Sequence, residues 1–127
     1  MKNKKLIGKG EFIYDYKYDI LTFKIKDRNY KKSIEIQNFA VDIDDQDFVT
    51  GIRVFDASKV FGIDKYVLRN IVHGEFKASV EKNIMTITIK FVFMQRNKLI
   101  FTKKENFVQQ ITAPIKNVAD SVSECAV

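Results

Sequence analysis

Apolar and polar residues alternate along most of this chain, and this pattern constrains its fold more than any other feature. In the first half the apolar members are Phe12 and Tyr14; Leu21, Phe23 and Ile25; Ile34 and Ile36; Phe39, Val41 and Ile43; and Ile52 and Val54. The second half repeats the pattern at Phe76, Ala78 and Val80, and then from Met85 to Phe93. Because successive side chains of a strand point to opposite faces, a period of two predicts strands with one buried and one wet face. We predict a mainly antiparallel sheet of roughly seven to nine strands.

Two stretches depart from this alternation and have helical spacing instead. Asp56 followed by Ala-Ser-Lys is typical of a helix N-cap, and Asp64 can cap a second helix that ends at Gly74. After Pro114, apolar residues fall at helical spacing at Ile115, Val118, Ala119, Val122 and Cys125. The sequence therefore predicts an α+β fold with a central helical segment near 57–72 and a C-terminal helix.

The length and composition favour a single domain over residues 1–127. A chain of 127 residues can bury a core without a metal or a disulfide. Its 46% hydrophobic and 30% charged residues are typical of globular proteins. No apolar stretch approaches the roughly 18 residues that cross a bilayer, and no linker-like segment divides the chain. We expect a cytoplasmic protein without membrane contact.

Residues 10–26 resemble residues 74–90, with seven identities in seventeen positions, beginning at Gly10-Glu11-Phe12 and Gly74-Glu75-Phe76. Each half also reads as strands followed by a helical pattern. The agreement has two interpretations: a tandem duplication of a strand-rich unit, covering 10–72 and 74–126, or coincidence between two amphipathic hairpins in a chain rich in Lys, Ile and Phe.

Two motifs of the first half are characteristic in their order and spacing. The first is Tyr14-Asp15 followed by Asp19-Ile20-Leu21-Thr22-Phe23, and the second is Gly51-Ile52 followed by Asp56-Ala57-Ser58-Lys59. Over about residues 12–62 the chain resembles a short prokaryotic family that is catalogued only as a domain of unknown function. It departs from the family pattern at Arg53, where an acidic residue is common. The resemblance implies a small β-rich fold with a helix, and it implies no activity.

Three carboxylates lie within these motifs, on Asp15, Asp19 and Asp56. Carboxylates in pairs can serve hydrolysis or metal binding, so a hydrolase-like enzyme is one hypothesis. Structural roles explain the same residues, because Asp19 falls at a hairpin turn and Asp56 at an N-cap. Ser58 and Lys59 are further candidates for weak ligand binding, since free amides at a helix N-terminus attract anions.

The residue types that build a metal or cofactor site are sparse. His73 is the only histidine, so a histidine-rich zinc site would need other chains. The acidic run of Asp42, Asp44, Asp45 and Asp47 lacks the glycine and the final glutamate of a calcium loop, and we interpret it as a solvated hairpin. A glycine-rich phosphate loop is absent from the sequence. We therefore assign no catalytic residue, and we expect no metal, cofactor or small-molecule ligand.

The formal net charge of +6 suggests nucleic acid as a partner, because basic residues displace counterions from phosphates. Only four of the 22 basic residues are arginine, which weakens this inference. A nucleic-acid-binding face would use the N-terminal lysines together with lysines of the second half, Lys77, Lys82, Lys90, Lys98, Lys103 and Lys104. Nearby aromatic residues such as Tyr16, Tyr18 and Tyr30 could add base stacking.

From Phe91 to Met94 the predicted strand is apolar on both faces. A strand with one wet face does not show this pattern, so another element must cover it, either the predicted C-terminal helix or a second copy of the chain. Three functions remain open: a non-catalytic, self-associating homodimeric module, a nucleic-acid-binding module, and a hydrolase-like enzyme. The sequence favours the first.

Overall fold

The computed structural model describes residues 4–97 and 100–126, with side chains described for 4–93 and 108–125. The strands are β1 (Lys4–Asp15), β2 (Ile20–Ile25), β3 (Tyr30–Ile36), β4 (Phe39–Asp44), β5 (Val49–Phe55), β6 (Ile71–Glu81), β7 (Ile84–Asn97), β8 (Ile100–Pro114) and β9 (Ser121–Ala126). Two short helices, α1 (Ala57–Phe61) and α2 (Lys65–Leu68), lie between β5 and β6.

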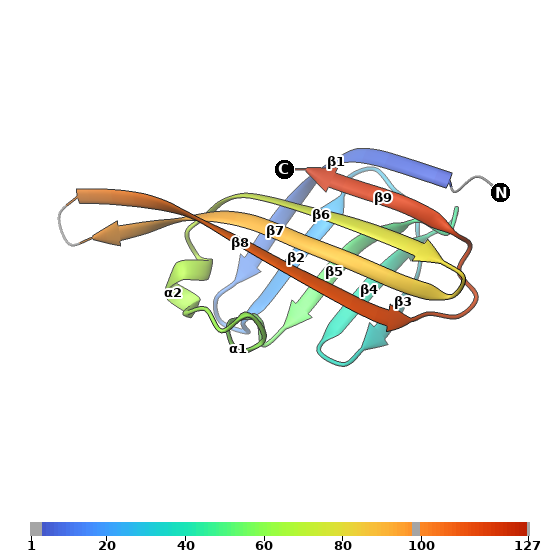
Figure 1. Ribbon diagram of the computed structural model, residues 1–127, viewed down its shortest axis with the longest axis horizontal. Helices are drawn as coiled ribbons and strands as arrows, with labels where there is room; N and C mark the ends of the chain where they lie inside the picture. Colours follow the sequence, from blue (N-terminus) through green and yellow to red (C-terminus); the bar gives the residue numbers. More distant parts are fainter. Residues whose placement is uncertain (1–3, 98–99, 127) are drawn as a thin grey trace.

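The nine strands form one sheet in the order β3-β4-β5-β2-β1-β9-β6-β7-β8. Neighbouring strands are antiparallel except for β1 and β9, which run parallel. The sheet curls so that β6, β7 and β8 cross in front of β2, β5, β4 and β3 (Figure 1). The chain is therefore mostly β, with its two edges formed by β3 and β8.

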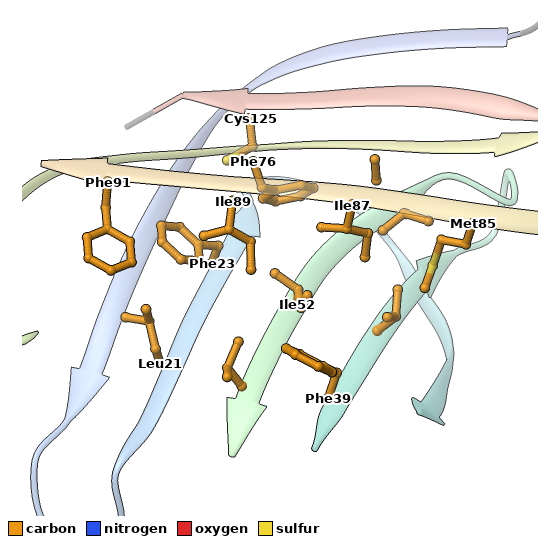
Figure 2. Close-up of a cluster of buried hydrophobic side chains, with 14 of the residues drawn as sticks. Leu21, Phe23, Phe39, Ile52, Phe76, Met85, Ile87, Ile89, Phe91 and Cys125 are labelled. Atoms are coloured by element: carbon orange, nitrogen blue, oxygen red, sulfur yellow. The ribbon is translucent and has the colours of Figure 1, made fainter. Parts of the chain in front are cut away.

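The core lies between the two halves of this curled sheet. Figure 2 shows Met85, Ile87, Ile89 and Phe91 of β7 pointing toward Leu21 and Phe23 of β2, Phe39 of β4 and Ile52 of β5. All eight of these side chains are buried. The alternation on β7 and β2 places their apolar residues on the two facing surfaces, so the two halves bury each other.

Strand β1 joins the two halves because it changes partner at Gly10. Its residues 4–9 pair with β9, whereas its residues 10–15 pair with β2. A Cβ atom on Gly10 would overlap Cys125 Sγ and lie 2.6 Å from the carbonyl oxygen of Lys24. Only glycine leaves room for this close crossing of the backbone.

Opposite ends of the sheet are closed by segments of different kinds (Figure 1). At one end α1 and α2 bury Phe61 and Leu68, and the Phe61 ring lies 5.7 Å from the Phe91 ring. At the other end the segment 115–120 buries Ile115 and Val118. The backbone amide of Ala119 in that segment donates to Asp47 Oδ2 at 3.3 Å.

The predicted α+β class is wrong, and so is the predicted C-terminal helix. Residues 121–126 form strand β9, in which Ser121, Ser123 and Cys125 face the interior. Because two of these inward residues are serines, the period of two was hidden and the apolar spacing looked helical. Asn117, at φ 62°, interrupts any helix through this segment.

The central helical segment is also much shorter than the predicted 57–72. Its two helices have five and four residues, and β6 already begins at Ile71. Neither helix is long and apolar enough to cross a membrane, as judged over the described residues.

Candidate functional site

Of the predicted site residues, the structure brings Asp19 and Ser58 together with Tyr14. Asp19 ends the β1–β2 turn and its carboxylate is buried. Its Oδ2 accepts a hydrogen bond from Ser58 Oγ at 2.6 Å, and its Oδ1 accepts from the Ser58 backbone amide at 3.0 Å. Tyr14 Oη donates to the same Oδ1 at 2.6 Å. A carboxylate from a distant turn thus satisfies a free amide at the start of α1.

These contacts make Asp19 a poor general base. Burial alone would raise its pKa, but hydrogen bonds from Ser58 and Tyr14 and the charge of Lys65 outweigh burial and hold the pKa below its ordinary value. The pKa of Tyr14 is raised, first by burial and then by its hydrogen bond to Asp19. A low-pKa carboxylate with three donors on its oxygens is suited to holding structure, not to taking a proton.

The other two predicted carboxylates lie apart from this cluster. Asp15 Oδ1 accepts from the backbone amide of Tyr18 at 3.0 Å within the β1–β2 turn. Asp56 occupies the N-cap position of α1 with φ 53°, but its exposed side chain makes no capping hydrogen bond. Lys59 is exposed on α1. The carboxylates of Asp15, Asp19 and Asp56 therefore serve separate positions and line neither of the two hollows in the surface.

The acidic run after residue 41 is part of the β4–β5 hairpin, but one of its members is fully buried. Asp44 Oδ1 accepts from the backbone amides of Gln46 and Phe48, both at 2.9 Å, and its Oδ2 accepts from Arg28 Nε at 2.8 Å. The interpretation of this run as wholly solvated is thus wrong for Asp44. Within residues 4–97 and 100–126, no group of three or more His, Cys, Asp or Glu residues could hold a metal ion.

The predicted lysine face is mixed in charge where it can be described. Lys77 lies opposite Glu124 and Lys90 opposite Glu75 on the outer face of β9, β6 and β7, around a hollow of about 320 Å³. Lys82 lies in the β6–β7 turn. Lys98 falls outside the described residues, and the side chains of Lys103 and Lys104 fall outside the described side chains.

A second cationic cluster, which the sequence did not predict as a unit, forms where the β1–β2 turn meets α2. We call it the tyrosine platform, and it consists of Tyr16, Tyr18, Tyr66, Lys17, Lys65 and Arg69. Lys65 Nζ and Arg69 Cζ lie 4.9 and 4.6 Å from the centre of the Tyr16 ring. Arg69 Cζ is also 5.7 Å from the Tyr66 ring, and Lys17 Nζ is 5.2 Å from the Tyr18 ring. Tyr30, the third aromatic residue considered with the lysines, is instead at the start of β3.

The apolar stretch from Phe91 is covered by the chain itself, as far as its side chains are described. Phe91 and Phe93 are buried and Val92 is partly buried. Phe61 of α1 packs against Phe91 at 5.7 Å between ring centres. The side chain of Met94 lies outside the described side chains. Phe91 is therefore covered by the central helical segment together with β2, and neither was one of the two covers considered from the sequence.

The β8 edge of the sheet is a different surface. In the described part of the chain β8 has β7 as its one neighbour. Val108 on β8 is 60% exposed. The alternation of apolar and polar residues could not predict this edge, because it does not show which strand lies at the edge of the sheet.

Comparisons with known proteins give two archaeal relatives. No protein-family model and no solved structure matches the chain. An uncharacterised protein of Methanocaldococcus jannaschii is 33% identical over 97 residues, which cover 76% of this chain and 82% of the relative. A protein of Methanosarcina mazei, named "Putative hypoxanthine phosphoribosyltransferase", is 31% identical over 100 residues, covering 79% and 80%. The chain therefore belongs to the family of these two archaeal proteins, one of which is uncharacterised.

Proposed function

We propose that this protein is a non-catalytic β-rich module that self-associates by pairing the β8 edges of two copies. The observation that carries the proposal is the composition of that edge. From Val108 to Ala113 the strand has six residues without a charge, in a strand with one neighbour. An exposed strand edge of this kind presents unpaired N–H and C=O groups to another chain.

The opposite edge of the sheet has no comparable uncharged run, whereas the charges of β8, on Lys103, Lys104 and Glu105, all precede Val108. Strand β3 has seven residues, against fifteen in β8. It begins with an irregularity between Tyr30 and Lys32, and it carries charges on Lys31, Lys32 and Glu35. Bulges, short length and edge charges all discourage pairing with another strand. The contrast supports β8, and not β3, as the surface of self-association.

A two-fold axis at Gln110 would give an antiparallel pair of β8 strands without charged neighbours. Val108 would lie opposite Thr112 of the second copy, and Gln109 opposite its Ile111. Such cross-strand pairs each contribute about 0.2–1 kcal/mol. Residues 108–112 provide these pairs twice in a symmetric dimer, because each copy offers the same segment to the other.

The test is the molar mass in solution, measured by light scattering coupled to size exclusion. We expect the wild-type protein to be a dimer, and Val108→Lys to raise the dissociation constant at least about tenfold, or roughly 1.4 kcal/mol, by placing a charge on the edge. Val72→Lys is the matched control, because Val72 is 55% exposed on β6, inside the sheet. A monomeric wild-type protein, or equal effects of both variants, would overturn the proposal.

The alternative function is an enzyme, which the name of the Methanosarcina mazei relative suggests. The buried, low-pKa carboxylate of Asp19 argues against it. The purified protein should form no phosphoribosylated hypoxanthine when hypoxanthine and a phosphoribosyl donor are supplied. Formation of that product by the wild-type protein would replace the non-catalytic proposal with this one.

A further inference from the structure

The tyrosine platform has no part in the self-association proposed above. It gathers three of the five tyrosines of the chain at one end of the sheet, around α2 and the β1–β2 turn. Tyr18 is 63% exposed and Tyr66 is 65% exposed. Single exposed aromatic residues are ordinary on protein surfaces. Here three tyrosines lie next to three cations, so one surface combines aromatic rings with positive charge.

The cations of the platform are not neutralised by direct ion pairs. Over the described residues, the five ion pairs of the protein use Lys5, Lys24, Arg28, Lys31 and Arg53 as their cations. Lys17, Lys65 and Arg69 lie against tyrosine rings instead. A cation over an aromatic ring keeps its full charge and its outward N–H groups, so it can still attract an anion.

Two carboxylates close to the platform in the sequence, those of Asp15 and Asp64, accept hydrogen bonds from its backbone, and the buried carboxylate of Asp19 also interacts with the charge of Lys65. Asp15 Oδ1 accepts from the amide of Tyr18 at 3.0 Å, and Asp64 Oδ1 accepts from the amide of Tyr66 at 2.7 Å. Both contacts fix the backbone of a platform tyrosine. Among the described residues, neither carboxylate forms a direct ion pair with a cation of the platform.

We propose that the tyrosine platform binds single-stranded nucleic acid. Tyr18 and Tyr66 would stack on unpaired bases, and Lys17, Lys65 and Arg69 would contact the phosphates on either side. Arg69 lies against the rings of both Tyr16 and Tyr66, so its positive charge is directly beside the aromatic surface on which bases would stack. Exposed aromatic rings with neighbouring cations are the usual means of binding single strands without sequence preference. A duplex hides its base faces within its own stack, so it is expected to bind more weakly.

A purely structural role for these contacts makes a different prediction. If the cations only held α2 against the β1–β2 turn, Tyr16 alone would serve, since Lys65 and Arg69 both lie over its ring. The outward rings of Tyr18 and Tyr66 would then be dispensable for every property of the protein. Replacement of Tyr18 or Tyr66 is therefore the decisive test. Because both side chains are exposed, the replacements should leave the fold unchanged.

The experiment is fluorescence anisotropy with a labelled oligothymidylate of about 15 nucleotides, a length that an ordinary single-strand site covers. We expect Tyr18→Ala and Tyr66→Ala each to weaken binding by about 5- to 100-fold, from the loss of one stacked base. Arg69→Gln should weaken binding and lower the slope of log affinity against log salt by about 0.7, because one phosphate contact is lost on a single strand.

Two controls separate the platform from other surfaces. Tyr30→Ala is matched to Tyr66→Ala, because both side chains are 65% exposed, and it should leave binding unchanged. The double variant Lys77→Gln with Lys90→Gln tests the outer face of β6 and β7, and it should also bind as the wild type does. Absence of binding by the wild-type protein, equal binding of a duplex of the same length, or loss of binding only in the Lys77 and Lys90 variant would overturn the proposal. Thermal melts followed by circular dichroism verify that each variant is folded.

Discussion

At the scale of single residues, two aspartates with similar positive φ angles have different roles. Asp19 and Asp56 both have positive φ, of 57° and 53°. The carboxylate of Asp19 is buried and accepts hydrogen bonds from Ser58 and Tyr14, whereas that of Asp56 is exposed without a capping hydrogen bond. The position before α1 looked like the N-cap, yet the capping side chain comes from a turn 39 residues earlier.

Asparagine substitutions at these two sites give a matched test of that difference. Asn tolerates positive φ as well as Asp does. Asp19→Asn should lower the free energy of unfolding by about 1–3 kcal/mol, because a charged acceptor is lost from buried donors. Asp56→Asn should change it by no more than about 0.5 kcal/mol. Urea denaturation at pH 7 measures both, and equal losses would show that Asp19 does not cap α1.

The same pair has a characteristic pH dependence. The pKa of Asp19 in the folded protein lies below its ordinary value of 3.8, so its contribution to stability is complete above that value and is lost as pH falls through the folded pKa. The gap in unfolding free energy between wild-type protein and Asp19→Asn should therefore shrink below about pH 4. Asp56→Asn is the matched variant, and its small effect on stability leaves almost no gap to follow. A gap that stayed constant down to pH 2 would contradict the assignment.

At the scale of elements, β1 shows how one strand can belong to two halves of a sheet. It exchanges β9 for β2 at Gly10, where the backbone passes close to the carbonyl of Lys24. The alternation of Phe12 with Tyr14 predicted the second part of this strand. It did not predict the first part, where the partner β9 is more than 100 residues away in the chain.

Alanine substitutions at two glycines of β1 test the crossing. A Cβ on Gly10 would press on the Lys24 carbonyl, which cannot move without the sheet, whereas a Cβ on Gly8 would meet only the side chain of Ile25. We expect Gly10→Ala to cost about 2–3 kcal/mol and Gly8→Ala less than about 1.5 kcal/mol. Urea denaturation measures both. A harmless Gly10→Ala would show that the backbones do not cross as closely as described.

At the scale of the whole molecule, the last strand lies in the middle of the sheet. Strand β9 pairs with β1 on one side and with β6 on the other, so it connects the half that contains β2 to the half that contains β7. Contacts between the two ends of the chain close the largest loop that the chain can form, which makes folding slow and dependent on the complete sheet.

A chain ending at residue 120 should therefore fail to fold. Without β9, β1 and β6 each lose a neighbour and the buried face of Cys125 is opened. The measurement is the dispersion of amide signals in a nitrogen–proton correlation spectrum, which should collapse in the truncated chain. Addition of a peptide of residues 115–127 should restore part of it. Full dispersion in the truncated chain alone would show that the two halves hold together without β9.

Much of the strand content could be predicted from the sequence, and little of the candidate site. The alternation through Leu21, Phe23 and Ile25, and again from Met85 to Phe93, depends on residues two apart, so it is visible locally. The prediction of a C-terminal helix was wrong because two of the three buried residues that alternate along β9 are serines, so the alternation was not apolar. The Asp19 cap and the tyrosine platform join residues from different turns and helices, and no local pattern contains them.

The sequence by itself determined that the chain is built of strands with one apolar face, since that property lies in residues two apart. It also indicated two of the hairpin turns, at Asp19 and at the acidic run from Asp42 to Asp47. Only the tertiary structure decided that β9 is inserted between β1 and β6, that α1 covers Phe91, and that β8 is left with a free edge. Each of these depends on contacts between segments that are distant in the sequence. Such contacts form only when the chain packs into its tertiary structure, so no local pattern contains them.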